Sequence, residues 1–91
     1  MATKHLNIRI TGKVQGVNYR DSARDYAEEI GVKGFVRNEP DGSVHLEAEA
    51  DEDTLQRLMS WLREGPSAAD VGEVIAEDGP VRDFTGFSVE A

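Results

Sequence analysis

A short run near the N-terminus has the residue types and the spacing of an anion-binding turn. It reads Gly12-Lys13-Val14-Gln15-Gly16-Val17-Asn18-Tyr19-Arg20. Two glycines bracket a turn between a strand pattern and a helix pattern, and Arg20 stands where the helix would begin. Backbone N–H groups in such a turn, the helix N-terminus and the arginine all favour negative charge. The run therefore predicts a site for a phosphate-like ligand.

A second segment with similar character is Gly34-Phe35-Val36-Arg37-Asn38, followed by Asp41-Gly42. Taken alone, Asn38 is more typical of a strand end or a turn than of a functional site. Taken alone, the glycines are equally typical of turns and bulges. Only the combination of the two segments makes this one a candidate.

Several other kinds of site are excluded or disfavoured by the residues. The chain has no cysteine, so it has no thiolate nucleophile, no disulfide and no cysteine metal site. Gly12-Lys13 is not a P-loop, because Asn7 stands where that motif needs its first glycine. The acidic cluster Asp51-Glu52-Asp53 is more typical of a solvated helix start than of a cation site. We expect neither a metal nor a cofactor.

The elements that must position these residues alternate between strand and helix periodicity. Residues 4–11 and 43–50 alternate apolar and polar side chains, and residues 33–39 have an apolar centre, so all three predict strands. Apolar residues at helical spacing predict a helix from Asp21 to Ile30 and another from Asp51 to Gly65. Weaker strand patterns follow at residues 71–77 and 84–89.

The resulting order, βαββαβ, predicts an α+β fold of the ferredoxin-like α/β sandwich type. We expect an antiparallel sheet of four to five strands with both helices on one face. The length predicts a single domain, residues 1–91. In the strand at residues 43–50, His45, Glu47 and Glu49 fall on the face opposite the apolar side chains, and His45 is expected to be solvated.

The charge is large and uneven, with a net value of −8. Residues 1–37 carry seven basic against four acidic side chains, whereas residues 38–91 carry three against fourteen. This balance disfavours non-specific binding to nucleic acid or to anionic lipid, yet leaves room for one local anion site. With no apolar run long enough for a membrane span or a signal peptide, we expect a cytoplasmic protein. The acidic surface suggests the hypothesis of a salt-rich cytoplasm.

The two segments together resemble the acylphosphatases, a family of small ferredoxin-like enzymes that hydrolyse the carboxyl–phosphate bond of acyl phosphates without a cofactor. The resemblance covers essentially the whole chain. It implies that Arg20 binds phosphate, that Asn38 orients the attacking water, and that backbone N–H groups of Gln15, Gly16, Val17, Asn18, Tyr19 and Arg20 cradle the phosphate. Asn18 departs from the family, which usually has a bulky apolar residue there, and the position of Tyr19 is often Phe. The implied partners are an acyl phosphate and inorganic phosphate, with the chain acting as a monomer.

The residue types suit this chemistry on independent grounds. A carboxylate leaving group has a pKa of roughly 4 and needs no general acid. Phosphoryl transfer then asks mainly for positioning and charge stabilisation. Two alternatives stay open at this point. One is a regulatory or interaction module with the same fold, such as occurs within a large hydrogenase-maturation protein. The other is RNA binding on the sheet, which the acidic strand at residues 43–50 disfavours.

Overall fold

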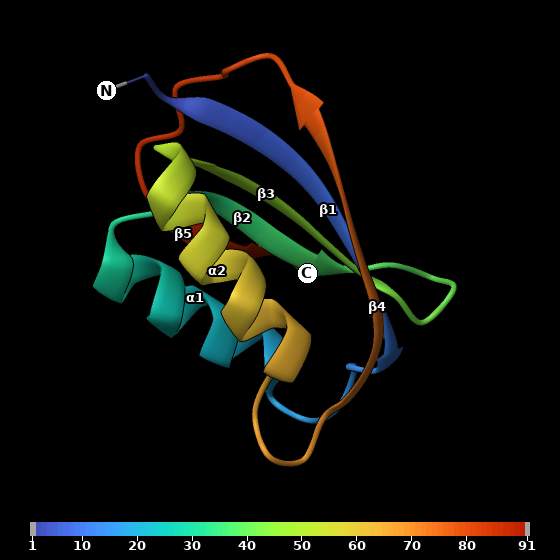
Figure 1. Ribbon diagram of the computed structural model, residues 1–91. Helices are drawn as coiled ribbons and strands as arrows, with labels where there is room; N and C mark the ends of the chain where they lie inside the picture. Colours follow the sequence, from blue (N-terminus) through green and yellow to red (C-terminus); the bar gives the residue numbers. More distant parts are fainter. Residues whose placement is uncertain (1, 91) are drawn as a thin grey trace.

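Two helices cover one face of a five-stranded sheet in the computed structural model, which describes residues 2–90 (Figure 1). The strands and helices, in chain order, are β1 (Lys4–Lys13), α1 (Tyr19–Ile30), β2 (Lys33–Asn38), β3 (Val44–Ala50), α2 (Glu52–Glu64), β4 (Asp70–Gly79) and β5 (Phe87–Glu90). The predicted order of elements and the ferredoxin-like α+β fold are therefore confirmed, with β5 as a fifth strand.

The sheet is mixed, so the prediction of a purely antiparallel sheet was wrong in one pairing. The strand order is β4-β1-β3-β2-β5, and β5 pairs with β2 in parallel while all other pairs are antiparallel. A connection over residues 80–86 carries the chain from β4, the outer strand on one side of the sheet, across to β2. There β5 pairs in parallel with β2 and becomes the outer strand on the other side. Because β1 and β2 both flank β3 in antiparallel pairing, the C-terminal ends of β1, β2 and β5 meet at one edge of the sheet.

The core lies between the helices and the sheet, where the predicted apolar stripes are buried. In α1 the buried side chains include Ala23 and Ala27, and in α2 they are Leu55, Leu58, Met59 and Leu62. The sheet contributes apolar residues from its central strands, among them Ile8, Ile10, Val36, Val44 and Leu46. Burial of these stripes is the main force that fixes both helices on the same face. Within residues 2–90, neither helix has the length and apolar character needed to cross a membrane.

The ends of several elements differ from the prediction. Helix α1 begins at Tyr19, two residues before Asp21, because Asn18 takes the left-handed conformation (φ 63°, ψ 25°) and starts the helix. Strand β4 is longer than predicted, at both ends, because its whole length pairs with β1. Strand β5 begins at Phe87 instead of Phe84, since the preceding residues cross the sheet.

The connection over residues 80–86, which we call the strap, covers polar residues of β3 on the sheet face away from the helices. Glu49, expected on a polar face, is only 4% exposed. Its carboxylate accepts hydrogen bonds from the backbone N–H of Arg82 (2.5 Å) and of Phe84 (3.1 Å), and lies 2.7 Å from Nδ1 of His5. Burial acts to raise the pKa of Glu49, but these hydrogen bonds outweigh it and hold the pKa below its ordinary value.

The neighbouring polar residues of β3 are also less exposed than the alternation suggested. Glu47 is buried, and its carboxylate contacts Nη1 of Arg82 at 3.2 Å and Nε2 of His45 at 3.0 Å. His45, expected to be solvated, lies on the predicted face but is half-buried. The alternation of β3 predicts that this face is exposed to solvent. The strap instead covers it, and the polar side chains of Glu47 and Glu49 pack beneath the strap.

Candidate active site

The loop between β1 and α1 lies at the sheet edge where β1, β2 and β5 end (Figure 1). Residues 14–18 follow the end of β1, and Asn38 is the last residue of β2. A hollow of about 230 Å³ opens here, and its lining residues are Val14, Gly16, Asn18, Tyr19, Arg20, Asp21 and Asn38. The two segments singled out in the sequence therefore lie side by side in space.

The loop backbone is suited to an anion. Gly16 (φ 73°) and Asn18 (φ 63°) both take left-handed conformations, which glycine and asparagine tolerate better than other residues. The side chain of Asn18 does not cap α1; its Nδ2 instead donates to Oγ of Ser22 at 3.4 Å. The first N–H groups of α1 thus have no side-chain cap and lie at the hollow, where the helix dipole favours negative charge. The left-handed backbone also gives a physical reason for asparagine at position 18.

Arg20 is held at the hollow by the last strand. Its Nη1 donates to the backbone carbonyl of Glu90, at the end of β5, over 2.8 Å. An arginine carries five donors, and within residues 2–90 this is the one hydrogen bond that the Arg20 guanidinium makes, so its other N–H groups can bind an anion. Asp21 lines the same hollow and lies 4.0 Å from Nη1 of Arg24. Among residues 2–90, Arg20 is the only cationic side chain that lines the hollow.

Asn38 carries the most informative atom of the site. Its side-chain Oδ1 is buried and accepts no hydrogen bond from any group of residues 2–90. Buried polar atoms are nearly always hydrogen-bonded, and one without a partner costs about 1–3 kcal/mol. Because Asn38 lines the hollow, this oxygen is placed to accept a hydrogen bond from a water or ligand inside it.

The structure brings together most, but not all, of the residues predicted for the site. Gly16, Asn18, Tyr19, Arg20 and Asn38 line the hollow. Two residues of the predicted loop do not line it: Val17 packs against the hydrophobic core, and the side chain of Gln15 turns to the β2–β3 hairpin.

The sequence reasoning missed three features of the site. Asp21 at its rim was assigned only to a helix turn, and the carbonyl of Glu90 was not considered. The hydrogen bond from the side chain of Gln15 to the carbonyl of Glu39 was not predicted either. No local signal could have found the last two, because both partners are distant in sequence.

Tyr19 fixes the start of α1 by a buried contact with α2. The side chain is 1% exposed, and its hydroxyl donates to the carbonyl of Leu62 at 2.7 Å. Burial raises the pKa of the Tyr19 hydroxyl well above its ordinary value, so the group stays protonated and remains a donor.

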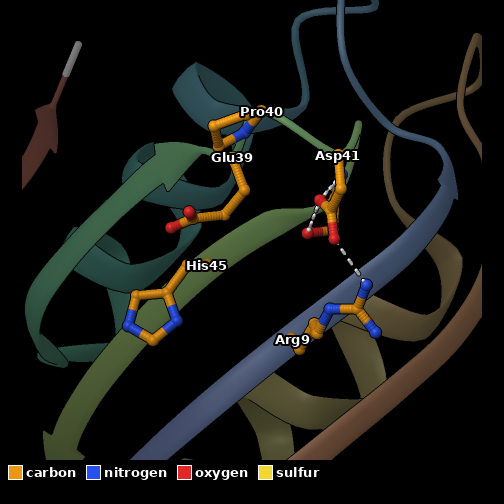
Figure 2. A pocket seen from close by; sticks show the side chains of 6 residues that line it. Arg9, Glu39, Pro40, Asp41 and His45 are labelled. Atoms are coloured by element: carbon orange, nitrogen blue, oxygen red, sulfur yellow. Dashed lines mark hydrogen bonds and ion pairs between the residues drawn. The ribbon is translucent and has the colours of Figure 1, made fainter.

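A second and larger hollow, of about 450 Å³, lies on the sheet face away from the helices (Figure 2). Figure 2 shows Arg9 beside Asp41, with Glu39 and His45 nearby. Nη2 of Arg9 lies 2.7 Å from the carboxylate of Asp41. A phosphate here would have to displace the carboxylate of Asp41 and face that of Glu39. The smaller hollow at Arg20 and Asn38 is therefore the better candidate for an anionic ligand, despite its size.

Comparison with known proteins identifies the family of the chain. The sequence profile of the acylphosphatase family matches residues 6–89. The chain belongs to the acylphosphatase family. It is 44% identical to an acylphosphatase of Roseiflexus sp. over 98% of this chain and 95% of that protein. It is 46% identical to an acylphosphatase of Salinibacter ruber over 94% of this chain and 92% of that protein.

The fold comparison gives the same family. The structure of an acylphosphatase from Coxiella burnetii superimposes with a TM-score of 0.93 at 39% identity, over 97% of this chain and 93% of that one. Membership in the family makes this protein a hydrolase, with an acyl phosphate as the substrate class and phosphate as a product.

Proposed function

We propose that this acylphosphatase hydrolyses small acyl phosphates by direct attack of a water molecule that Asn38 orients, while Arg20 and the loop backbone hold the phosphate. The observation that carries the proposal is the buried Oδ1 of Asn38, which has no hydrogen-bond partner among residues 2–90 and lies beside Arg20 at the same hollow. An amide oxygen in this position can accept a hydrogen bond from a water molecule. This bond orients the water so that a lone pair on the water oxygen points at phosphorus.

The phosphate is held by two kinds of donor. The N–H groups of Gly16, of Asn18 and of the start of α1, all from residues that line the hollow, donate to the anion. Arg20 adds a full positive charge, with its orientation fixed by the carbonyl of Glu90. Charge-assisted hydrogen bonds of this type stabilise the negative charge that the transition state spreads over the three equatorial phosphate oxygens.

The chemical step needs little more than this arrangement. The water oxygen forms a bond to phosphorus, and the bond between phosphorus and the carboxyl oxygen breaks with its electron pair leaving on the carboxylate. The proton lost by the water passes to the phosphate product. The carboxylate is a stable anion at neutral pH, so no general acid is required, and the loose transition state depends on positioning and electrostatics.

Two variants separate the proposed roles. Arg20→Ala removes a charge-assisted contact and should weaken binding of inorganic phosphate by about 10- to 100-fold, which corresponds to about 1.5–3 kcal/mol. Asn38→Ala should lower kcat for benzoyl phosphate by about 100-fold while phosphate still binds. Arg57→Ala is the control, because Arg57 is an exposed arginine of α2 and does not line the hollow.

The outcome that contradicts the proposal is specific. Near-normal turnover of benzoyl phosphate by Asn38→Ala would remove Asn38 from the mechanism. Unchanged phosphate affinity in Arg20→Ala would remove Arg20 from the binding site.

We also propose that the protein acts as a cytoplasmic monomer that binds neither nucleic acid nor membranes, in a salt-rich cell interior. The net charge of −8 disfavours binding to nucleic acid and to anionic membranes, because like charges repel. Salt screens the repulsion among the acidic side chains themselves, which suits a salt-rich cell interior. Size-exclusion chromatography checks the monomer. A melting temperature that does not change up to molar KCl would contradict the adaptation to salt.

A further inference from the structure

The side chain of Gln15 leaves the phosphate loop and binds the hairpin that follows Asn38. Its Nε2 donates to the carbonyl of Glu39 at 2.9 Å and to the carbonyl of Ser43 at 2.9 Å. Both protons of the amide are thereby used, since a glutamine nitrogen carries two. The side chain is half-buried and does not line the hollow.

The hairpin that Gln15 binds is held together by its own hydrogen bonds. The N–H of Glu39 donates to the carbonyl of Ser43 at 2.9 Å, and the N–H of Gly42 donates to the carbonyl of Glu39 at 3.1 Å. The carboxylate of Asp41 accepts from the hydroxyl of Ser43 at 2.6 Å and from its N–H at 2.9 Å. The amide of Gln15 thus connects to two carbonyls that the hairpin already fixes in place.

This connection joins the two halves of the candidate site. Gln15 directly precedes Gly16, the first glycine of the phosphate loop to line the hollow, and Glu39 directly follows Asn38. The two strands that end here, β1 and β2, do not pair with each other, because β3 lies between them. The pairing of β1 with β3 reaches only as far as Ile10, so the end of β1 and the loop after it extend beyond the ladder that holds Asn38.

We infer that Gln15 is a positioning residue that sets the spacing between the phosphate loop and Asn38. The inference rests on the proposed function, in which the loop holds phosphate and Asn38 holds the attacking water. In-line attack requires the phosphate and the attacking water to be correctly placed at the same time. A misplacement of about 1 Å between them costs on the order of 100-fold in rate. Phosphate binding depends on the loop and on Arg20 alone, so the bridge acts on turnover more than on affinity.

The test compares Gln15→Glu with the wild-type enzyme. Glutamate has the same shape, but at neutral pH its carboxylate faces two carbonyl oxygens without a proton to donate. We expect kcat for benzoyl phosphate to fall by about 10- to 100-fold. The dissociation constant of inorganic phosphate, measured by calorimetry, should rise by much less than kcat falls, because no phosphate contact is removed and the side chain at position 15 lies outside the hollow. As pH is lowered and the carboxyl takes up a proton, one donor returns, and kcat relative to wild type should rise.

Gln56→Ala is the matched control, because Gln56 is the other glutamine of the chain and is exposed on α2. Gln15→Asn is the second variant: it keeps an amide but is shorter by one methylene, and it should lose turnover in the same way. A purely structural role for Gln15 predicts a lower melting temperature with normal kcat in the folded enzyme.

The inference and the proposed function fail in different ways. If the Gln15 variants keep kcat within about twofold of wild type while Asn38→Ala and Arg20→Ala lose theirs, the positioning role is wrong and the function stands. If Asn38→Ala and Arg20→Ala keep their turnover, the proposed mechanism itself is wrong. Loss of phosphate binding equal to the loss of kcat in Gln15→Glu would also overturn the positioning role, because it would place Gln15 in binding.

Discussion

The hydrogen bond from Tyr19 to the carbonyl of Leu62 offers a test of how α1 and α2 are joined next to the candidate site. The carbonyl of Leu62 would normally accept from the N–H four residues later in helix α2. That residue is Pro66, which has no N–H. The Tyr19 hydroxyl therefore supplies a donor that the helix cannot supply itself, and Tyr19→Phe removes this donor without changing the shape of the ring.

The magnitude follows from the burial of both groups. Tyr19 is 1% exposed and Leu62 is 0% exposed, so water does not readily replace the hydroxyl. Loss of a buried hydrogen bond that leaves one partner unsatisfied costs about 1–3 kcal/mol. We expect Tyr19→Phe to lower the free energy of unfolding by about 1.5 kcal/mol. For a domain of this size, that corresponds to a fall in Tm of about 6–12 °C.

Thermal and urea unfolding followed by circular dichroism measure the effect, with Tyr26→Phe as the control. The ring of Tyr26 stacks on Trp61 at 5.7 Å, and for its hydroxyl the structure shows no hydrogen-bond partner in residues 2–90. Tyr26→Phe should change stability by less than about 0.5 kcal/mol. Equal losses in the two variants would refute the assignment, because the effect would then belong to tyrosine as a residue type and not to the bond with Leu62.

Three further predictions concern the fold. Gly34→Ala should lower the free energy of unfolding by at least about 3 kcal/mol in urea unfolding, because a Cβ at φ 150° would overlap a backbone carbonyl of β3, whereas Gly86→Ala, with open space around it, should have little effect. Asp51→Ala should cost about 0.5–2 kcal/mol in the same assay, since Asp51 caps α2 by accepting from the N–H of Thr54 at 2.8 Å; Asp51→Asn, which keeps the acceptor, should recover most of it. Glu49 has a pKa held below its ordinary value of 4.5, so its contribution to stability is complete above that pH and is lost as the pH falls through the pKa of the folded state. Unfolding free energies measured from pH 7 to pH 3 should therefore decline less steeply in Glu49→Gln, and parallel slopes would show that Glu49 carries no such contribution.

Much of the fold could be predicted because its signals are local. The apolar stripe of α2 and its acidic start at Asp51 each lie within a few consecutive residues, and the structure confirms both. The parallel pairing of β5 with β2 could not be predicted in this way, because Phe87–Glu90 is short and its pattern does not encode which edge it joins. Glu49 was misjudged for a related reason: the alternation of β3 correctly put it on the far face, but the cover over that face comes from a strap some thirty residues later in the chain.

By itself the sequence determined the loop with its glycines, the helix that starts after it, and the residue types Arg20 and Asn38 that suit an acyl phosphate. These depend on backbone preferences and on side-chain chemistry, which consecutive residues carry. Three other features depend on packing between distant parts of the chain: the two segments face one hollow, the carbonyl of Glu90 holds Arg20, and Gln15 reaches the hairpin beyond Asn38. The reason is the strand order: with β3 between β1 and β2, three strand ends meet at one edge of the sheet, and contacts between them span 24 to 70 residues of chain.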